Sequence, residues 1–318
     1  WAWVVPGRYA IAPEIAVEQA GGASIPNNGD PQDFGTVVVG SEKSLTFTVR
    51  NIGSAVLNLS GTPPVAIGGT NAADFTVTTQ PSATVAVDGS TTFTVKFAPS
   101  AKGDRTASLS IANDDSDENP FVINLSGAAI LPPEIAIEQP ANTGIASGGS
   151  KDFGTVGIGF SNSLTFTIRN TGEADLNLTG TPRVAISGAH KDEFTVTSQP
   201  NASVAGAGTT TFTVRFAPTA VGIRSAALTI ANNDIDEGSF VINLTGTSVL
   251  PPDIAVEQPV NTGIASGGSK DFGTVAWGSS KSLTFTVRNT GLAGLSLNSL
   301  PRVIVGGTHS ADFLVTAS

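Results

Sequence analysis

The side chains with the clearest capacity for chemistry are four carboxylates that stand close together in the sequence: Asp114, Asp115, Asp117 and Glu118. Hard cations such as Ca²⁺ bind several oxygen ligands from one loop, so this run is a candidate calcium site. It lacks the Asp-x-Asp-x-Asp-Gly order of a calcium-binding loop, and a hairpin favours Asn and Asp at its turn in any case. We therefore expect a turn here, with calcium binding as the alternative.

Other side chains give little support for catalysis. The chain has no cysteine and two histidines, His190 and His309, which occupy equivalent places in a repeated sequence. Neither has a second histidine or a carboxylate cluster at ligand spacing, and no Gly-x-Ser-x-Gly motif occurs. We predict that both histidines are polar turn residues, that the chain is not an enzyme and that it uses no cofactor.

Asparagine offers a modification rather than a reaction. Five Asn-x-Ser/Thr sequons, the acceptors of N-linked glycans in secreted proteins, occur at Asn58, Asn124, Asn177, Asn201 and Asn243. The alternation of polar and apolar residues puts all of these except Asn201 on the outward face of predicted strands. Outward asparagines are also ordinary surface residues of a β-sandwich, and we favour that interpretation.

Composition and charge exclude several classes of partner. The 318 residues include 16 Lys and Arg against 26 Asp and Glu, with no basic run, so we expect no nucleic-acid partner. No apolar run approaches the roughly 18 residues of a membrane helix, so we expect no membrane insertion. The chain has neither Cys nor Met, the easily oxidised residues, which suits an extracellular or cell-surface location.

An internal repeat sets the elements that position these residues. The sequence Asp-Phe-Gly-Thr-Val begins at Asp33, Asp152 and Asp271, 119 residues apart in each case. This period is too long for one turn of a solenoid and fits a complete sandwich domain of about 100 residues. We therefore predict a strand-like segment over 1–12, repeats over 13–131 and 132–250, and an incomplete repeat over 251–318.

Within one repeat, apolar and polar residues alternate with the period of a strand. In Leu45-Thr46-Phe47-Thr48-Val49 the apolar side chains point inward and the threonines face water. For the first repeat we predict strands near 14–18, 34–39, 44–50, 56–59, 74–79, 91–97, 106–112 and 121–126. The predicted fold class is all-β, with tandem antiparallel immunoglobulin-like sandwiches joined by short Pro-Pro linkers.

These motifs together resemble a known family. They are Asp-Phe-Gly-Thr-Val, Leu-Thr-Phe-Thr-Val-Arg-Asn with Ile52-Gly53 or Thr171-Gly172 after it, Phe75 after Ala72-Ala73-Asp74, and Phe97-Ala98-Pro99 before Gly103. The pattern resembles choice-of-anchor D repeats of bacterial surface and secreted proteins, which are similar to the Hydin-type immunoglobulin-like domains of ciliary proteins. The resemblance implies scaffolding and binding, and it supplies no catalytic residues.

Three functional hypotheses follow. We favour a non-catalytic structural building block of an extracellular fibre, filament or stalk, because strands, turns and linkers recur whereas no reactive group does. The second hypothesis is an adhesin or carbohydrate-binding module, for which Trp277 is the candidate aromatic platform. Trp277 replaces Val39 and Ile158, so a place in the core or between domains is at least as favoured. The third is an accessory region of a larger secreted enzyme.

The start of the chain resembles the end of a domain. Residues 1–7 lie 120 residues before 121–127, in the register of a final strand, and Trp1, Trp3 and Val5 can fill its inward positions. Position 1 is not Met, so we expect a processed product or a fragment.

The end of the chain resembles the start of a domain. Its last repeat lacks the final three strands, which leaves Leu283, Phe285 and Val287 without a facing sheet. One explanation is a window on a longer array. The other is a polymer in which the first strand of one copy completes the third domain of its neighbour. Under both explanations the expected partners are copies of the same unit, head to tail.

Overall fold

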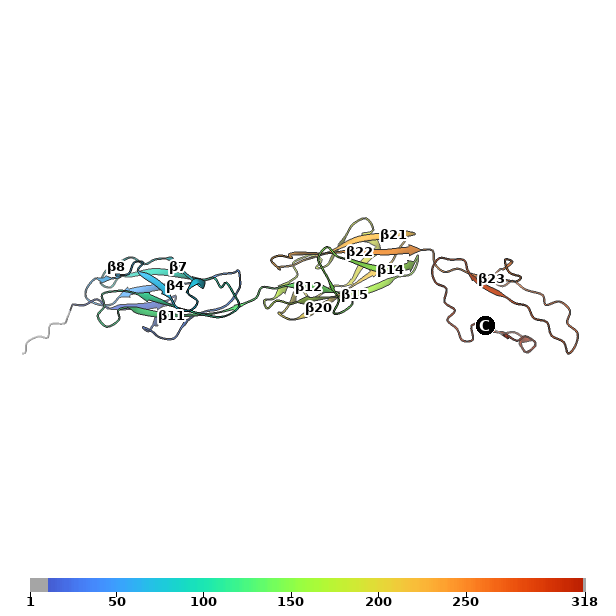
Figure 1. Ribbon diagram of the computed structural model, residues 1–318, viewed down its shortest axis with the longest axis horizontal. Helices are drawn as coiled ribbons and strands as arrows, with labels where there is room; N and C mark the ends of the chain where they lie inside the picture. The colour runs from blue at the N-terminus through green and yellow to red at the C-terminus, as the bar shows by residue number, and fades with distance from the viewer. Residues whose placement is uncertain (1–10, 317–318) are drawn as a thin grey trace, which may run out of the picture. The chain divides into compact units, whose positions relative to one another are not determined.

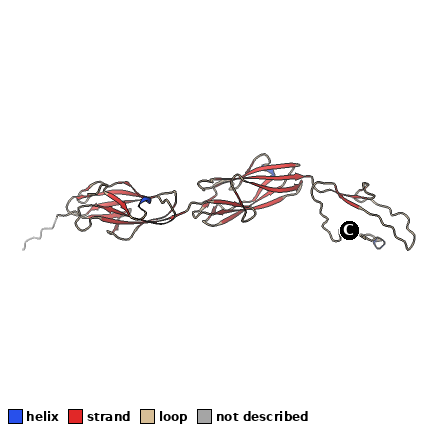
Figure 2. Cartoon of the chain, in the orientation of Figure 1, coloured by secondary structure: helices blue, strands red, loops and turns tan. Residues whose placement is uncertain are grey.

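The computed structural model describes residues 11–316. The candidate inter-subunit residues Trp1, Trp3 and Val5 therefore lie outside the described residues. Regular structure in 11–316 is almost entirely strand, as Figure 2 shows, and the all-β prediction is confirmed. Three short 3-10 helices complete it: Ala72–Asp74, Lys191–Glu193 and Ser310–Asp312. Over the same residues, no helix has the length and apolar character that a membrane span requires.

The first domain is a sandwich of two sheets (Figure 1). One sheet has the strand order β2-β1-β4-β9-β7, the other has the order β3-β11-β10-β6, and a small ladder joins β5 to β8. The strands are β1 Ile15–Gln19, β2 Ala23–Ile25, β3 Gln32–Val38, β4 Lys43–Asn51, β5 Leu57–Asn58, β6 Val65–Gly68, β7 Phe75–Thr79, β8 Thr84–Val85, β9 Ser90–Phe97, β10 Gly103–Ile111 and β11 Phe121–Ile130.

The second domain repeats this arrangement strand for strand. Its sheets have the orders β13-β12-β15-β20-β18 and β14-β22-β21-β17, with β16 joined to β19. The strands are β12 Ile135–Glu138, β13 Gly144–Ile145, β14 Ser150–Gly157, β15 Asn162–Asn170, β16 Leu176–Asn177, β17 Ala185–Ser187, β18 Phe194–Ser198, β19 Ser203–Val204, β20 Thr209–Phe216, β21 Gly222–Ala231 and β22 Ser239–Val249.

Strict alternation along the long strands builds the core of each domain. In β11 every second side chain is buried, beginning with Phe121, and this pattern lets one face of the strand pack inward. Phenylalanine rings fill the centre: Phe47 stacks on Phe93 at 5.2 Å, and Phe166 stacks on Phe212 at 5.0 Å in the second domain. Truncating one such ring to alanine costs about 3–5 kcal/mol.

One strand pair differs from the predicted antiparallel arrangement. β11 runs antiparallel to β10 but parallel to β3, and β22 likewise runs parallel to β14. A parallel pair needs a long crossover, and here the crossover is the rest of the domain. The prediction for the first repeat also missed β2, β6 and β8, because strands of two to four residues are too short to show alternation.

Residues 251–316 contain few strands. They are β23 Ile254–Glu257, β24 Gly263–Ile264 and β25 Thr286–Asn289, in the order β24-β23-β25. Phe285 is 43% exposed, whereas Phe47 and Phe166 at the equivalent positions of the two sandwiches are fully buried. Within the described residues, no second sheet faces this one.

Candidate functional site

A loop after the second long strand of each repeat binds the backbone that enters the domain. In the first domain the loop is five residues long and begins at Asn51. Asn51 Oδ1 accepts the N–H of Gly53 at 3.0 Å, and its Nδ2 donates to the carbonyl of Ala55 at 2.7 Å. The N–H of Ile52 donates to the carbonyl of Glu14, just before β1, at 2.9 Å. We call this loop the entry clamp.

The entry clamp recurs with the same hydrogen bonds. In the second domain Asn170 Nδ2 donates to the carbonyl of Ala174 at 2.8 Å. The N–H of Thr171 donates to the carbonyl of Glu134 at 2.8 Å, and the N–H of Ala174 donates to that of Leu131 at 3.0 Å. The corresponding bonds of the third repeat join Asn289 to Ala293, Thr290 to Asp253 and Ala293 to Leu250.

Glycine at the third position of each entry clamp permits a close approach of two backbones. A Cβ on Gly172 would overlap the carbonyl oxygen of Pro132, and a Cβ on Gly53 would lie 2.5 Å from that of Ala12. Any larger residue must push the entering chain away. The sequence shows Gly53 and Gly172 as part of a family motif without indicating a role, and the recurrence of a glycine two residues after the Asn of each repeat is the signal that marks them.

The predicted calcium run lies beside the start of β1. Asp115 is buried, and its Oδ2 accepts the N–H of Ile15 at 2.9 Å. One carboxylate oxygen from each of Glu14, Asp115 and Asp117 lies within 4.8 Å of the others. With Glu118 these residues form the acidic pole of the first domain. Glu14 was not predicted, and the signal that could have found it is the acidic residue before the first strand of every repeat.

The remaining residue of the predicted calcium run, Asp114, binds a different part of the domain. Asp114 Oδ1 accepts the backbone N–H of Asn58 at 2.8 Å, and its Oδ2 accepts the Asn58 amide at 2.6 Å. In the second domain Asp234 Oδ2 accepts the N–H of Ile135 at 2.8 Å, as Asp115 does for Ile15. These bonds connect the last hairpin to strands distant in sequence, so they support the prediction of a turn.

Repulsion among the carboxylates shapes the electrostatics of the acidic pole. Burial raises the pKa of Glu14, and the charges of Asp115 and Asp117 raise it further. The pKa of Glu118 is raised by burial and then by the charges of Asp115, Glu14 and Asp117. For Asp114, burial opposes the change, but the hydrogen bonds from Asn58 bring its pKa below the ordinary value. Either a proton or a cation would relieve the repulsion.

The predicted glycosylation sites differ in exposure and in the use of the amide nitrogen. Asn58, Asn177, Asn201 and Asn243 are exposed, whereas Asn124 is half-buried. The Nδ2 atoms of Asn58, Asn124 and Asn243 donate hydrogen bonds to neighbouring residues. At these three positions the acceptor nitrogen of a glycan is therefore already hydrogen-bonded in the folded domain.

The remaining candidate residues are His190 and Trp277. His190 Nδ1 accepts the N–H of Ser225 at 3.0 Å, as Asn71 Oδ1 does for Thr106 at the equivalent position of the first domain. The prediction that His190 is a polar turn residue is confirmed. Trp277 is fully exposed, so a place for it in the core is wrong. It stands in a turn beyond a segment that forms no strand in the third repeat.

Comparison with known proteins gives these domains a family. The model of the HYDIN/CFA65/VesB-like Ig-like domain matches residues 25–128 and again residues 149–247, more than half of the chain. The chain belongs to the HYDIN/CFA65/VesB-like Ig-like domain family. The Hydin-type resemblance is thereby confirmed, and its choice-of-anchor D part stays a prediction. Ig-like domains of the HYDIN/CFA65/VesB-like family are generally not catalytic.

Several solved structures have low similarity to this chain. A Porphyromonas gingivalis protein of unknown function is 14% identical, with 73% of this chain and 99% of that one covered and a TM-score of 0.28. The Vibrio cholerae VesB protease is 14% identical; the match covers 31% of this chain and 29% of the protease, with a TM-score of 0.24. Protocadherin gamma B7 is 9% identical; the match covers 82% of this chain and 58% of the protocadherin chain, with a TM-score of 0.34. At these values the structures support no conclusion about what this chain does. Among curated proteins, none matches it.

Proposed function

We propose that this HYDIN/CFA65/VesB-like chain is a non-catalytic structural element of an extracellular fibre, filament or stalk. Its domains follow one another, and further copies of the unit follow head to tail, so that the array sets a distance. The observation that carries the proposal is the entry clamp. It occurs at the start of all three repeats and binds the chain that arrives there.

We infer a stiff linker between the two sandwiches from its length, composition and hydrogen bonds. β11 ends at Ile130 and β12 begins at Ile135, so four residues connect them and span at most about 14 Å. Two of the four are prolines, whose φ is fixed near −65°. The carbonyls of the other two, Leu131 and Glu134, accept hydrogen bonds from the entry clamp of the second domain. Such a linker is suited to a semi-rigid spacer.

A distance measurement between spin labels tests this proposal. Ser44 and Ser163 are exposed and equivalent in the two domains, and the chain has no native cysteine, so Ser44→Cys and Ser163→Cys can be labelled cleanly. Double electron–electron resonance should give one narrow distribution of distances between the two labels. Pro132→Gly should broaden it, whereas Pro26→Gly, in an exposed turn of the first domain, should not. If the labelled chain with its native linker gave a distribution as broad as that of a flexible Gly-rich linker, the proposal of a semi-rigid spacer would be refuted.

One observation favours a second candidate function. The indole of Trp277 is fully exposed, as the platform of a carbohydrate-binding module would be. A glycan array with the wild-type chain and Trp277→Ala tests this candidate, and it gains support if a defined glycan is bound and then lost in the variant.

A further inference from the structure

The loop between β9 and β10 is held in place by a buried carboxylate and an arginine. It comprises residues 98–102, and we call it the exit loop. Asp74, which is 5% exposed, accepts hydrogen bonds from the N–H and the hydroxyl of Ser100 at 3.0 and 2.7 Å. Arg105 lies 3.6 Å from the same carboxylate and donates to the carbonyl of Lys102 at 2.9 Å. These bonds fix the backbone that carries the Lys102 side chain.

The second domain builds its exit loop, residues 217–221, in the same way. A buried glutamate, Glu193, accepts the N–H and the hydroxyl of Thr219 at 3.0 and 2.6 Å. Arg224 lies 3.4 Å from this carboxylate and donates to the carbonyl of Val221 at 2.9 Å. The structure of the exit loop therefore recurs, while its last residue changes from lysine to valine.

The exit loop of the first domain is bonded to the entry clamp of the second. Lys102 Nζ donates to Oε1 of Glu173, the fourth residue of that clamp, and the two side chains form an ion pair. Oε2 of Glu173 accepts the N–H of Leu131 at 3.0 Å. One carboxylate thus binds both the exit loop and the linker. Contacts between residues group Asn170–Leu176 with the first domain in one compact unit, so both partners of the ion pair belong to that unit.

The ion pair is charged at neutral pH and open to solvent. The hydrogen bond from Lys102 lowers the pKa of the Glu173 carboxyl, and the N–H of Leu131 lowers it further. The side chains of Lys102 and Glu173 are 56% and 33% exposed. Dissolved salt can therefore screen their attraction.

The corresponding positions around the next linker are both apolar. Val221 ends the exit loop of the second domain, and Leu292 is the fourth residue of the entry clamp in the third repeat. This entry clamp also lies beside the second domain, because a Cβ added to Gly157 would be 3.5 Å from the Cβ of Ala293. Lysine and glutamate at one junction thus become valine and leucine at the other. Both members change together, so the chemistry of the pair is matched at each junction.

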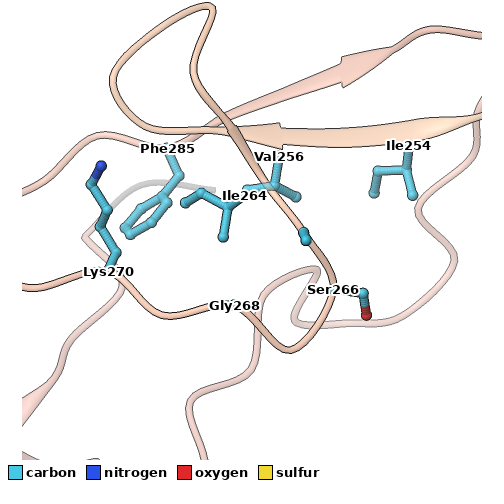
Figure 3. Close-up of a pocket in the computed structure, with 8 residues that line it drawn as sticks. Ile254, Val256, Ile264, Ser266, Gly268, Lys270 and Phe285 are labelled. Carbon is cyan, nitrogen blue, oxygen red and sulfur yellow. The ribbon is translucent and has the colours of Figure 1, made fainter.

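Val221 and Leu292 stand apart from the internal packing of the third repeat. Figure 3 shows Ile254, Val256 and Phe285 around a cavity of about 460 Å³ in that repeat. Neither Val221 nor Leu292 is among the residues that line this cavity. The cavity therefore does not account for their apolar character.

We propose that Lys102 and Glu173 form a salt-sensitive latch at the junction between the two sandwiches, and that Val221 and Leu292 are the apolar form of the same pair. The partner of an exit loop that ends in lysine is thus an entry clamp with a carboxylate at its fourth position. The inference rests on the proposed function and deepens it, because it names the residues that limit bending at each junction. Salt should loosen the ionic latch, whereas an apolar contact has no charge to screen.

Spin-label distances in the full chain test the latch. With labels at Ser44→Cys and Ser163→Cys, Lys102→Glu should broaden the distance distribution, because two carboxylates then face each other. Exchange of both charges in Lys102→Glu/Glu173→Lys should narrow it again. An exposed ion pair changes an equilibrium by no more than about five-fold, so the single variant should broaden the distribution without unfolding a domain.

Lys191→Glu is the matched control. The side chain of Lys191 is 55% exposed, close to the 56% of Lys102, and it pairs with the neighbouring Asp192 inside the second domain. This charge reversal should leave the distribution unchanged. In about 1 M NaCl, where charges are screened beyond about 3 Å, the native ion pair should give a broader distribution. Lys102→Val/Glu173→Leu, which transfers the apolar pair to the first junction, should give a narrow distribution with and without this salt.

A titration reads out the ion pair itself. In the chain with Lys102→Val, NMR should find the pKa of the Glu173 carboxyl raised toward its ordinary value. Glu173→Gln identifies the carboxyl resonance by its absence. An unchanged pKa would overturn the ion pair, and a broad distribution for the valine–leucine variant would overturn its apolar form.

The latch and the spacer can fail separately. A narrow distribution that Lys102→Glu leaves unchanged, or one that Lys191→Glu broadens equally, would overturn the latch and leave the spacer dependent on its linker alone. A native chain with a broad distribution at low salt would overturn both proposals.

Discussion

At the scale of residues, the passage of the chain into each domain depends on a few small or buried polar groups. The Asn of the entry clamp satisfies backbone donors and acceptors that would otherwise lie unpaired near the start of the first strand, and Asp115 or Asp234 accepts the N–H of the first residue of that strand. Leaving such buried groups unsatisfied costs about 1–3 kcal/mol each. Their recurrence is therefore explained by folding.

Replacing Gly172 with alanine should destabilise the second domain by about 1–3 kcal/mol, because its Cβ would overlap the carbonyl of Pro132 and the entering chain must shift. Gly144→Ala is the matched control, since nothing lies within 4 Å of a Cβ there. Urea unfolding followed by circular dichroism measures both. Equal stability of the two variants would show that the close approach has no energetic weight.

The acidic pole should make the first domain more stable as the pH falls from neutrality. The pKa values of Glu14 and Glu118 are raised above the ordinary 4.5 in the folded state, so this state binds protons that the unfolded chain releases. The free energy of unfolding therefore decreases as the pH rises from 4.5 through the raised pKa values. At still lower pH the trend reverses, because the lowered pKa of Asp114 contributes stability that its protonation removes.

Asp115→Asn isolates this effect. It removes the largest charge that acts on Glu14 and Glu118 after burial itself, so the melting temperature of the first domain should depend less on pH. Melting curves of the wild type and the variant between about pH 5 and pH 7 supply the test. A slope that the substitution leaves unchanged would contradict the proposed repulsion.

Part of this site was accessible from the sequence. The run around Asp115 was found by composition, and His190 was assigned to a turn because Asn71 occupies its place in the first repeat. Glu14 was not found, since the fold alone brings it beside residues about 100 positions later. The role of Gly172 was also hidden, because a close backbone approach leaves no trace in residue type beyond the glycine itself.

At the scale of elements, long strands were predictable and their pairing was not. Strands such as β4 and β11 alternate over nine and ten residues, so their type followed directly from the pattern. Local sequence contains nothing about the parallel partner of β3. The identical segments 142–156 and 261–275 make the point within one chain: among the described residues, the first segment forms the edge strand β14 beside β22, and the second forms no strand over 269–275.

Hydrogen exchange can test this dependence on a partner. Amides of 150–157 should be strongly protected and those of 269–276 should exchange rapidly. The two segments differ in sequence from Gly157 and Ala276 onward, so peptides that extend past these residues can be told apart by mass. Similar protection in both would mean that the segment forms a strand without its ladder.

At the scale of the whole molecule, tension applied to the two ends of the chain passes through each domain from its first strand to its last. The chain enters the first domain at β1 and leaves it at β11, and these two strands lie in different sheets. Extension must therefore separate strands from both sheets and expose the core between them. The second domain has the same topology from β12 to β22, so the two sandwiches should resist extension alike.

Single-molecule force spectroscopy of the full chain, attached by its two ends, tests the structural role most directly. The account predicts two abrupt unfolding events of similar force, one for each sandwich, and each should lengthen the chain by roughly 350–400 Å. Residues 251–316 should add length without an event of that kind. A chain that extends smoothly, with no resisting domain, would contradict the claim that these repeats form a structural spacer.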